Sequence, residues 1–303
     1  KVSVSHLLVA TAQETSGPVR RVLRAVGLSA PILRAAAGRG ASYRNDDGAS
    51  KGSAGEPKGD PLELYGRDLT RLAAQGKFDP VVGRDAELRR ILQVLARRHE
   101  NNPLLVGEPG VGRNSIVRSL AMRMAKGDVP KMLQERRLVA LELGALVAGA
   151  KLRGQLEERM RAVLDAVRDS AGEVVLAIPD LSSLVGERGS GAADLFAVAL
   201  ARGEVRAIAI ATPDGMRKAF DESSGLSRRF VPIPVEAPTM DEAVAILRGI
   251  VERFEIDHGV QITDPALVSA VRFARRYVPG VQLPKSAIDL VDEAAARVRV
   301  EME

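Results

Sequence analysis

GEPGVGRNS, residues 107–115, follows the apolar run NPLLV at 102–106 and opens a stretch with helical periodicity. A phosphate-binding loop has the pattern G-x-x-x-x-G-K-[ST] and lies between a strand and a helix. Gly107, Gly110 and Gly112 stand where such a loop needs glycine. The stretch therefore predicts a strand–loop–helix unit whose backbone N–H groups attract phosphate, rather than an ordinary glycine-rich turn.

Two side chains of this pattern are changed. Arg113 replaces the lysine, and Asn114 replaces the hydroxyl residue that binds magnesium. Arginine keeps the positive charge, but its planar fork is larger than a compact ammonium group. Asparagine offers a metal only an amide oxygen, and the hydroxyl of Ser115 is turned by about 100° because it lies one residue further along the helix. The changes predict a loop that still attracts phosphate but handles a metal poorly.

Short apolar segments alternate with helical ones around the loop. The strand segments are apolar throughout, as a sheet covered by helices on both faces requires. We therefore predict an α/β fold with a parallel sheet. The predicted helices are 60–76, 86–98 and 113–125, and the predicted strands are 102–107, 136–143, 173–178 and 205–212.

After Pro238 the pattern is helical only, which predicts a small all-α domain with helices at 240–255, 264–277 and 283–303. Candidate helix ends are Asp241 and Asp264 at starts and Gly259 and Gly280 at stops. Four parts are predicted along the chain: a helical fragment at 1–37, a flexible linker rich in Gly, Ser and charge at 38–58, the α/β domain at 59–236 and the all-α domain at 237–303.

The composition excludes several classes of protein. The chain has 303 residues, a net charge of +5 and no cysteine, which excludes disulfides and thiolate metal sites. It has no apolar run of about 18 residues and no signal-peptide pattern at Lys1, so we expect a piece of a longer cytoplasmic protein without a membrane span. Aromatic residues are few and basic pairs are scattered, so nucleic acid is not an expected partner. His6, His99 and His258 lie too far apart in sequence to suggest a metal site or a Ser-His-Asp group.

Long segments on both sides of the loop carry a family resemblance. They are FDPVVGRDAELRRILQVLARR at 78–98, NNPLLVGEPGVGRNSIVRSLAMRMAKGDVP at 101–130, LVALELGALVAGAKLRGQLEERM at 138–160, and the runs beginning ITDPALVSA at 262 and AIDLVDEAAARVR at 287. Together they resemble the first ATPase ring of the ClpB-type disaggregases of the AAA+ family, and residues 3–37 are similar to the end of the Clp amino-terminal domain. The resemblance implies an AAA+ core, a helical lid and a hexameric ring whose nucleotide sites lie between subunits.

The resemblance also implies roles for individual residues, and one further motif departs from it. Family members end a strand with Asp-Glu, in which the Asp holds magnesium and the Glu activates water. Pro179 and Asp180, in VVLAIPDLSSLVG, occupy these positions. Proline has no ligand atom, and Asp180 is one methylene shorter than glutamate. The candidate roles of Asp180 are to orient water or, instead, to take over the metal, which leaves nothing nearby for the water; a helix cap or loop acid is the alternative.

Other family positions are retained. Thr212 matches the polar sensor of the γ-phosphate. Arg228 and Arg229 match paired arginines that reach into the next subunit's site, with surface salt bridges as the alternative role. Val81 and Val82 match the segment that lines the adenine pocket, with core packing as an equal alternative. The candidate phosphate-binding residues are Gly107, Gly110, Val111, Gly112, Arg113, Asn114 and Ser115.

The substrate-gripping pore loop of the family matches GAKLRGQ at 149–155, with Lys151, Leu152 and Arg153 at its centre. The family places an aromatic residue where this chain has Leu152. Leucine is apolar but lacks a flat face for gripping a threaded backbone. An ordinary loop role is the alternative.

The losses are concentrated where chemistry happens, while the fold-determining stretches are kept, which is typical of a pseudo-enzyme. We expect a Clp/ClpB-like module that binds ATP or ADP weakly and without Mg²⁺, hydrolyses little or none, and acts through assembly or partner binding. The expected partners are a homo- or hetero-hexameric ring, including an active ClpB-like paralogue, and protein clients. Two alternatives are a working ATPase with unusual site residues that remodels proteins, and an adaptor whose amino-terminal fragment binds clients while the AAA+ part is a scaffold.

Overall fold

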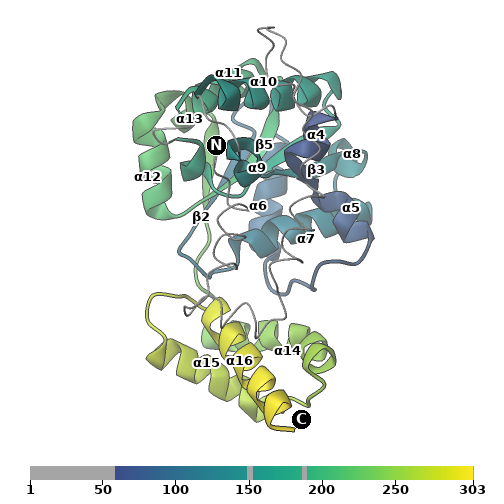
Figure 1. The fold of residues 1–303 in the computed structure, drawn as a ribbon, viewed down its shortest axis with the longest axis vertical. Coiled ribbons are helices and arrows are strands. Elements are labelled where there is room, and N and C mark those ends of the chain that lie inside the picture. Colours follow the sequence, from purple (N-terminus) through teal and green to yellow (C-terminus); the bar gives the residue numbers. More distant parts are fainter. Residues whose placement is uncertain (1–58, 149–152, 186–189, 303) are drawn as a thin grey trace, which may run out of the picture. The chain divides into compact units, whose positions relative to one another are not determined.

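The computed structural model describes residues 59–148, 153–185 and 190–302, and the features below are those of these residues. A six-stranded sheet forms the centre of the larger part (Figure 1). Its strands lie in the order β1-β3-β4-β5-β2-β6. The strands are β1 (Gly66–Asp68), β2 (Asn102–Val106), β3 (Arg137–Leu141), β4 (Val174–Ile178), β5 (Arg206–Ala211) and β6 (Phe230–Pro234).

The sheet is parallel except at one edge, where β1 runs antiparallel to β3. The central strand β4 is buried along its whole length, because helices cover both faces of the sheet. The predicted α/β fold is therefore confirmed. Carboxyl ends of the parallel strands meet at one edge of the sheet, which we call the carboxyl edge, and their amino ends meet at the opposite amino edge.

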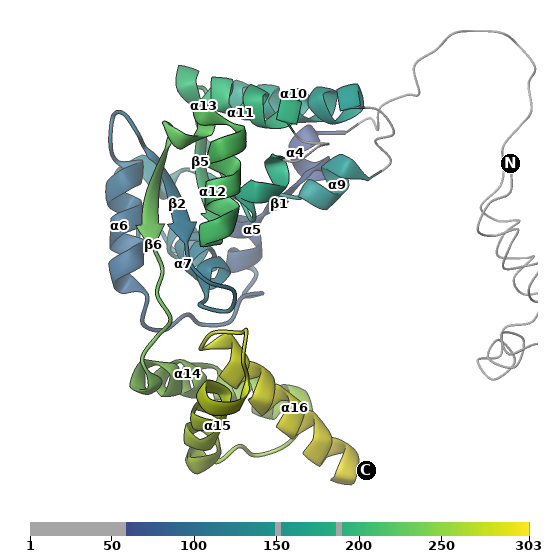
Figure 2. The same ribbon diagram turned by 90° about the vertical axis from the view of Figure 1, so that its left-hand side faces the viewer.

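Alternating side chains of each strand enter two separate cores. On β4, Val174, Leu176 and Ile178 join one core, and Val175 and Ala177 join the other. We name the two sides the α10 face and the α7 face; Figure 2 shows α12 of the first and α6 of the second on opposite sides of β2 and β6. The α10 face carries α4 (Pro61–Leu64), α9 (Leu143–Val147), α10 (Arg153–Asp169), the 3₁₀ turn η1 (Leu181–Leu184), α11 (Ser190–Arg202), α12 (Pro213–Glu222) and α13 (Ser224–Ser227). The α7 face carries α5 (Leu69–Ala74), α6 (Asp85–Leu95), α7 (Arg113–Ala125) and α8 (Lys131–Gln134).

Three helices follow the sheet: α14 (Met240–His258), α15 (Asp264–Tyr277) and α16 (Lys285–Met302). They enclose a third core of their own and form the helical lid (Figure 1). The lid begins with a capping box, in which the hydroxyl of Thr239 accepts from the N–H of Glu242 and the Glu242 carboxylate accepts from the N–H of Thr239. Thr239 and Thr263 are the N-cap residues. Asp264 is the first residue of α15, as predicted, and Asp241 is the second residue of α14, one residue after the start.

Two elements differ from the sequence predictions. The helix predicted over 60–76 is interrupted by β1, because Gly66 lies against the sheet: a Cβ there would be 2.6 Å from the carbonyl oxygen of Leu62 and 2.7 Å from Val139. The edge strand β6 was not predicted. It contains two prolines, which an edge strand tolerates.

The predicted amino-terminal helices at 1–37 and the linker at 38–58 lie outside the described residues. The division of the chain near residue 236 stays a prediction. Within the described residues, no helix combines the length and hydropathy that crossing a bilayer needs.

Candidate functional site

The glycine-rich loop connects the carboxyl end of β2 to the amino end of α7. Gly110 and Gly112 have φ values of 94° and 95°, which side-chain-bearing residues rarely adopt. A Cβ on Gly107 would be 2.4 Å from the carbonyl oxygen of Val235, and one on Gly110 would be 2.7 Å from that of Gln282. The backbone of a phosphate-binding loop is therefore in place, and it depends on these glycines.

Arg84 holds the loop from beneath. Its guanidinium is buried and donates to the carbonyl oxygens of Val111 at 2.6 Å and Glu236 at 3.2 Å, and to the Glu87 carboxylate at 2.7 Å. The side chain thus connects the start of α6, the loop and the segment that leads to the lid. Sequence reasoning missed Arg84, because the carbonyl groups that it binds lie 27 and 152 residues further along the chain.

The lid holds the outer side of the loop. The backbone N–H of Gln282 donates to the carbonyl oxygen of Pro109 at 3.1 Å, and that of Lys285 donates to Gly110 at 3.3 Å. The loop is therefore fixed on both sides by backbone and arginine contacts, independently of the side chains at 113–115.

A cavity of about 220 Å³ lies between the loop, the segment at 79–82 and the lid. It includes the predicted Val81 and Val82 together with Gly112 and Ser115. Val82 also packs against α14, since a Cβ on Gly249 would be 2.6 Å from its methyl group. The full lining is Asp79, Pro80, Val81, Val82, Arg84, Val111, Gly112, Ser115, Arg118, Ile246, Ile250, Phe254, Pro284 and Ile288.

An ion pair joins the two walls of this cavity. Arg253 of α14 pairs with Asp79 and also donates to the carbonyl oxygen of Gly76 at 3.2 Å. The bond to Asp79 raises the pKa of Arg253. The cavity is apolar on most sides and open to the loop, an arrangement that suits a flat base whose phosphates extend toward α7.

Arg113, Asn114 and Ser115 form the first turn of α7. Arg113 is partly buried, and this burial lowers the pKa of its guanidinium, while the negative charges of Asp180 and Glu108 oppose the shift. Asn114 is exposed on the helix surface. The structure thus brings the positive charge of Arg113 to the loop, while Asn114 takes the place of a metal-binding hydroxyl.

A second cavity, of about 210 Å³, lies on the α7 face at the carboxyl edge. Asn114 and Pro179 both line it, and they stand where the family resemblance puts the two metal ligands. Glu142, which directly follows β3, is its acidic member. The full lining is Arg67, Leu69, Phe78, Asn114, Val117, Arg118, Ala140, Glu142, Ala177, Pro179 and Ile210.

Asp180 caps the 3₁₀ turn η1. One carboxylate oxygen accepts from the N–H of Ser182 at 3.0 Å and from its hydroxyl at 2.7 Å, and the other accepts from the hydroxyl of Ser183 at 2.5 Å. Both oxygens are therefore engaged, which is the helix-cap alternative left open by the sequence. A role for Asp180 in orienting water stays a prediction.

The second cavity offers a magnesium ion fewer ligands than the family resemblance implies. Mg²⁺ prefers carboxylate oxygens and usually takes one or two of them together with phosphates. Pro179 offers no ligand atom and Asn114 offers an amide, so Glu142 is the one carboxylate in the described part of the chain that lines this cavity. Asp180 does not line it, and both of its oxygens accept hydrogen bonds from serines. Among the described residues, no group of three or more His, Asp or Glu side chains is placed to hold a metal.

Thr212 lies at the same edge, one residue after β5. Its hydroxyl accepts from the N–H of Gly215 at 2.9 Å and caps α12. The neighbouring carbonyl of Ala211 accepts from the N–H of Gly107 at 3.3 Å, so Thr212 is adjacent to the loop. Its role as a phosphate sensor stays a prediction.

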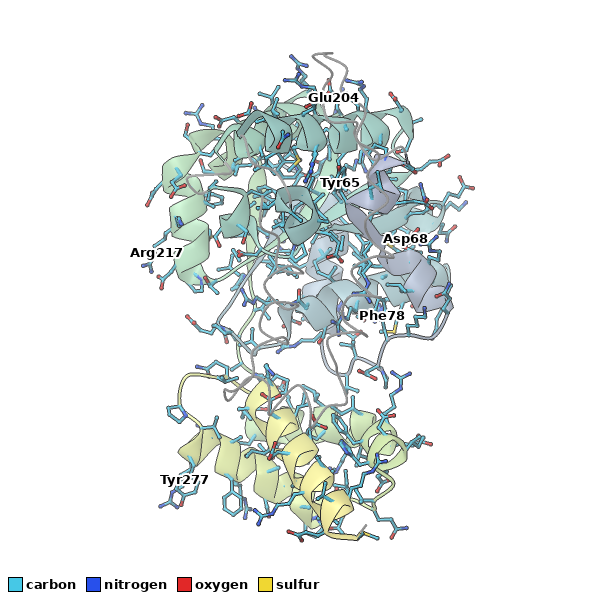
Figure 3. The ribbon with its side chains drawn as sticks, viewed as in Figure 1. Tyr65, Asp68, Phe78, Glu204, Arg217 and Tyr277 are labelled. Carbon is cyan, nitrogen blue, oxygen red and sulfur yellow. The ribbon has the colours of Figure 1, made fainter. Side chains whose placement is uncertain are left out.

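Arg228 and Arg229 lie at the amino edge, directly before β6. Because β2 and β6 are parallel, five residues of strand, or roughly 15 Å, separate these arginines from the glycine loop. In Figure 3, Phe78 lies near the end of the α/β part that is closer to the lid, and Glu204, two residues before β5, lies at the opposite end. In the described part of the chain, neither arginine side chain has a hydrogen bond or an ion pair. Because the length of a strand separates them from the glycine loop, Arg228 and Arg229 are too far away to contact a nucleotide bound at the loop of their own chain.

Asn102 fixes the backbone of this arginine pair. Its buried side-chain amide donates to the carbonyl oxygen of Arg229 at 3.2 Å and accepts from the N–H of Ala207 at 2.9 Å. Of the predicted pore loop, Lys151 and Leu152 lie outside the described residues, and Arg153 begins α10.

Comparisons with known proteins agree with this geometry. Residues 239–303 match the family model of the AAA lid domain, and residues 79–198 match that of the SMAX1 nucleotide binding domain. Chaperone protein ClpB 1 of Thermosynechococcus vestitus is 45% identical over 307 residues, covering 99% of this chain and 34% of that protein. Chaperone protein ClpB of Rhizobium meliloti is also 45% identical, covering 100% of this chain and 35% of that protein. The chain thus spans about a third of the length of these relatives.

Solved structures show the same likeness. A closed-state reconstruction of Hsp104 with ATPγS and FITC casein has a TM-score of 0.75 and 43% identity, over 80% of this chain and 42% of that chain. The Hsp104–ADP complex of S. cerevisiae has a TM-score of 0.75 and 44% identity, over 79% of this chain and 34% of that chain.

Proposed function

Since the chain belongs to the ClpB-type AAA+ chaperone family, we propose that it is a nucleotide-binding module of a ring-forming chaperone. Its own site binds adenine nucleotide weakly and hydrolyses it little or not at all. The α/β domain at 59–236 holds the loop, and the lid at 237–303 closes over the base. Matches to a nucleotide-binding domain model and to a lid model support this division.

One observation carries the proposal: the loop keeps its backbone while the side chains that handle metal and water have changed. Glycines, Arg84 and the lid hold the loop in shape. Backbone N–H groups and the start of α7 supply phosphate contacts whatever side chains follow. In contrast, phosphoryl transfer depends on charge neutralisation and on a correctly placed metal. The lysine position of the loop now holds Arg113, and the two metal-ligand positions hold Asn114 and Pro179.

ATP and ADP are the proposed ligands, bound weakly and without a need for Mg²⁺. Related chains have been solved with ATPγS and with ADP, and the cavity of about 220 Å³ beside Val81 and Val82 accommodates a base. Arg113 contacts the phosphates as a charge-assisted donor.

The proposed role in the ring is regulatory. Arg228 and Arg229 lie far from their own loop and have no side-chain partner among the described residues, so they are placed to serve an adjacent subunit. A subunit of this kind completes the site of an active ClpB-like paralogue in a mixed hexamer while its own site stays inactive. Casein in a related complex supports protein clients, for which the pore loop at 151–153 is the proposed contact.

The test is the affinity for nucleotide together with the steady-state rate of ATP hydrolysis by the purified protein. We expect binding at high micromolar to millimolar concentrations and a turnover several orders of magnitude below about 1 per second, which is within the ordinary range for enzymes. A turnover near that value favours a working ATPase with unusual ligands. If nucleotide does not bind at millimolar concentration, and clients bind only when residues 1–58 are present, the chain is an adaptor with an AAA+ scaffold.

A further inference from the structure

The cavity of about 210 Å³ on the α7 face exists because small side chains lie beneath it. Arg67 of β1 pairs with Ala140 of β3, which in turn pairs with Ala177 of β4. Residues paired across strands point to the same side of a sheet. Ala140 and Ala177 both belong to the core on the α7 face, so Arg67 also points to that face. Its long side chain therefore lies on the same face as Ala140 and Ala177, whose small side chains leave room for the cavity.

Arg118 reaches the same cavity from the opposite side. It lies one turn after Asn114 on α7, and long helical side chains lean toward the amino end of their helix. Its guanidinium lies over the ring of Phe78, 5.7 Å from the centre, and Phe78 also lines the cavity. Arg118 lines the base cavity as well, so it lies between the position of a base and the position of a metal.

The charges in this cavity are the reverse of those in a metal site. Arg67 and Arg118 bring two positive charges, and neither forms an ion pair with a carboxylate in the described part of the chain. Glu142 is the acid that lines the cavity, and Pro179 stands where a carboxylate would face the loop. Two guanidinium groups carry the same charge as one Mg²⁺ ion. Their fork-shaped donors bind phosphate oxygens in pairs.

We propose that this cavity binds the terminal phosphates of a nucleoside triphosphate directly, with Arg67 and Arg118 in place of a divalent metal. The inference rests on the proposed nucleotide binding and assigns the source of positive charge in that site. Arg113 neutralises the phosphates from the loop, and the two further arginines neutralise them from the sheet and from the second turn of α7. The triphosphate is then held by cations that cannot act as a Lewis acid, which fits a site that binds without hydrolysing.

Calorimetry with ATP, ADP and AMP on the full chain, in EDTA and in Mg²⁺, tests the proposal. We expect the affinity for ATP to differ by less than about threefold between the two conditions. Arg118→Ala and Arg67→Ala should each weaken ATP binding by about tenfold or more, because each removes a charge-assisted phosphate contact. Binding of AMP should change by less than about twofold in both variants, since AMP lacks the terminal phosphates.

Arg217→Ala is the matched control, because Arg217 is an exposed arginine on α12, away from Phe78 (Figure 3). It removes the same charge and should leave all three affinities unchanged. Arg118→Lys keeps the charge without the fork and should recover part of the loss. Thermal melting of each variant verifies that the fold is retained, and a variant that melts early is replaced by its lysine counterpart.

The outcomes separate the two proposals. If no nucleotide binds at millimolar concentration, the proposed function fails and this inference fails with it. If ATP binding requires Mg²⁺ and is lost in Glu142→Gln, nucleotide binding stands and Glu142 is a metal ligand, so the arginine site is overturned. Unchanged ATP affinity in both alanine variants also overturns it.

Discussion

The carboxyl edge and the amino edge of the sheet differ in how they match the family resemblance. At the carboxyl edge the glycines, Arg84 and the lid hold the backbone of the phosphate loop, while the side chains at 113, 114 and 179 depart from those that the family resemblance implies. At the amino edge the side chains of Arg228 and Arg229 are kept, and Asn102 fixes the backbone beneath them. Under the proposed function, binding through the backbone survives the loss of chemistry that depends on side chains, and the arginines that serve a neighbouring subunit are retained independently of both.

Two further arginines, Arg136 and Arg206, lie close to each other at the amino edge. Burial and the neighbouring charge of Arg206 lower the pKa of Arg136. One terminal nitrogen of Arg206 is buried without a hydrogen-bond partner in the described part of the chain. Buried guanidinium nitrogens are ordinarily paired.

The largest expected effect comes from restoring the carboxyl edge. The combined change Arg113→Lys, Asn114→Thr, Pro179→Asp and Asp180→Glu should raise ATP hydrolysis by about 10²–10³-fold, because the roles of these residues are coupled. Each single change should have less than about a threefold effect. The gain should disappear in EDTA, since it depends on a metal. If the combined variant binds Mg²⁺-ATP but hydrolyses no faster than wild type, these four positions do not limit hydrolysis by this chain.

The next effect concerns the support of the loop. Arg84→Ala should lower the free energy of unfolding by about 2–4 kcal/mol, because it removes a buried charge that satisfies two backbone carbonyls and Glu87. Arg89→Ala, an exposed arginine on the same helix, is the control and should cost less than about 0.5 kcal/mol. Urea unfolding measures both. Equal stability of the two variants would show that the loop holds its shape without Arg84.

The smallest effect is expected at the amino edge, where one subunit influences one site of a ring. An arginine supplied by a neighbour contributes about 10³–10⁵ in rate to the site that receives it. In a mixed ring, the double change Arg228→Ala with Arg229→Ala should therefore alter the total hydrolysis by a few fold without preventing assembly. Co-purification with an active ClpB-like paralogue from the same organism, followed by a rate measurement, tests this, with Arg217→Ala as the control. If the two proteins never share a ring, or if the double variant behaves as wild type, the arginines are ordinary surface charge.

Much of the fold could be predicted from the sequence. The helix predicted over 113–125 has those bounds in the structure, and the helix over 264–277 has them too. Both are bounded by strong local signals, a glycine loop in one case and a Thr-Asp-Pro start in the other. The two missed strands have weak local signals. Gly66 makes sense in β1 only because the sheet lies against it, and the prolines of β6 are tolerated only because that strand is at an edge.

The candidate site was less predictable from the sequence than the fold. The loop and the altered positions 113, 114 and 179 were visible because motifs are local in the chain. The engagement of Asp180 by two serines depends on the geometry of one 3₁₀ turn, and Arg84 acts through carbonyl groups at positions 111 and 236. No sequence pattern predicts a hydrogen bond from a side chain to a backbone carbonyl that is far away in the sequence.

By itself the sequence determined the strand–loop–helix unit, the family and the departures from its motifs, because glycine positions, apolar runs and helix periodicity act over a few residues. The tertiary structure alone decided which of these features share a site. It places Arg228 and Arg229 at the edge opposite the loop, and it brings Arg67 of β1 and Arg118 of α7 into one cavity. The physical reason is that strand order and the facing of side chains depend on how a sheet is assembled from segments far apart in the chain, and local patterns carry no record of that order.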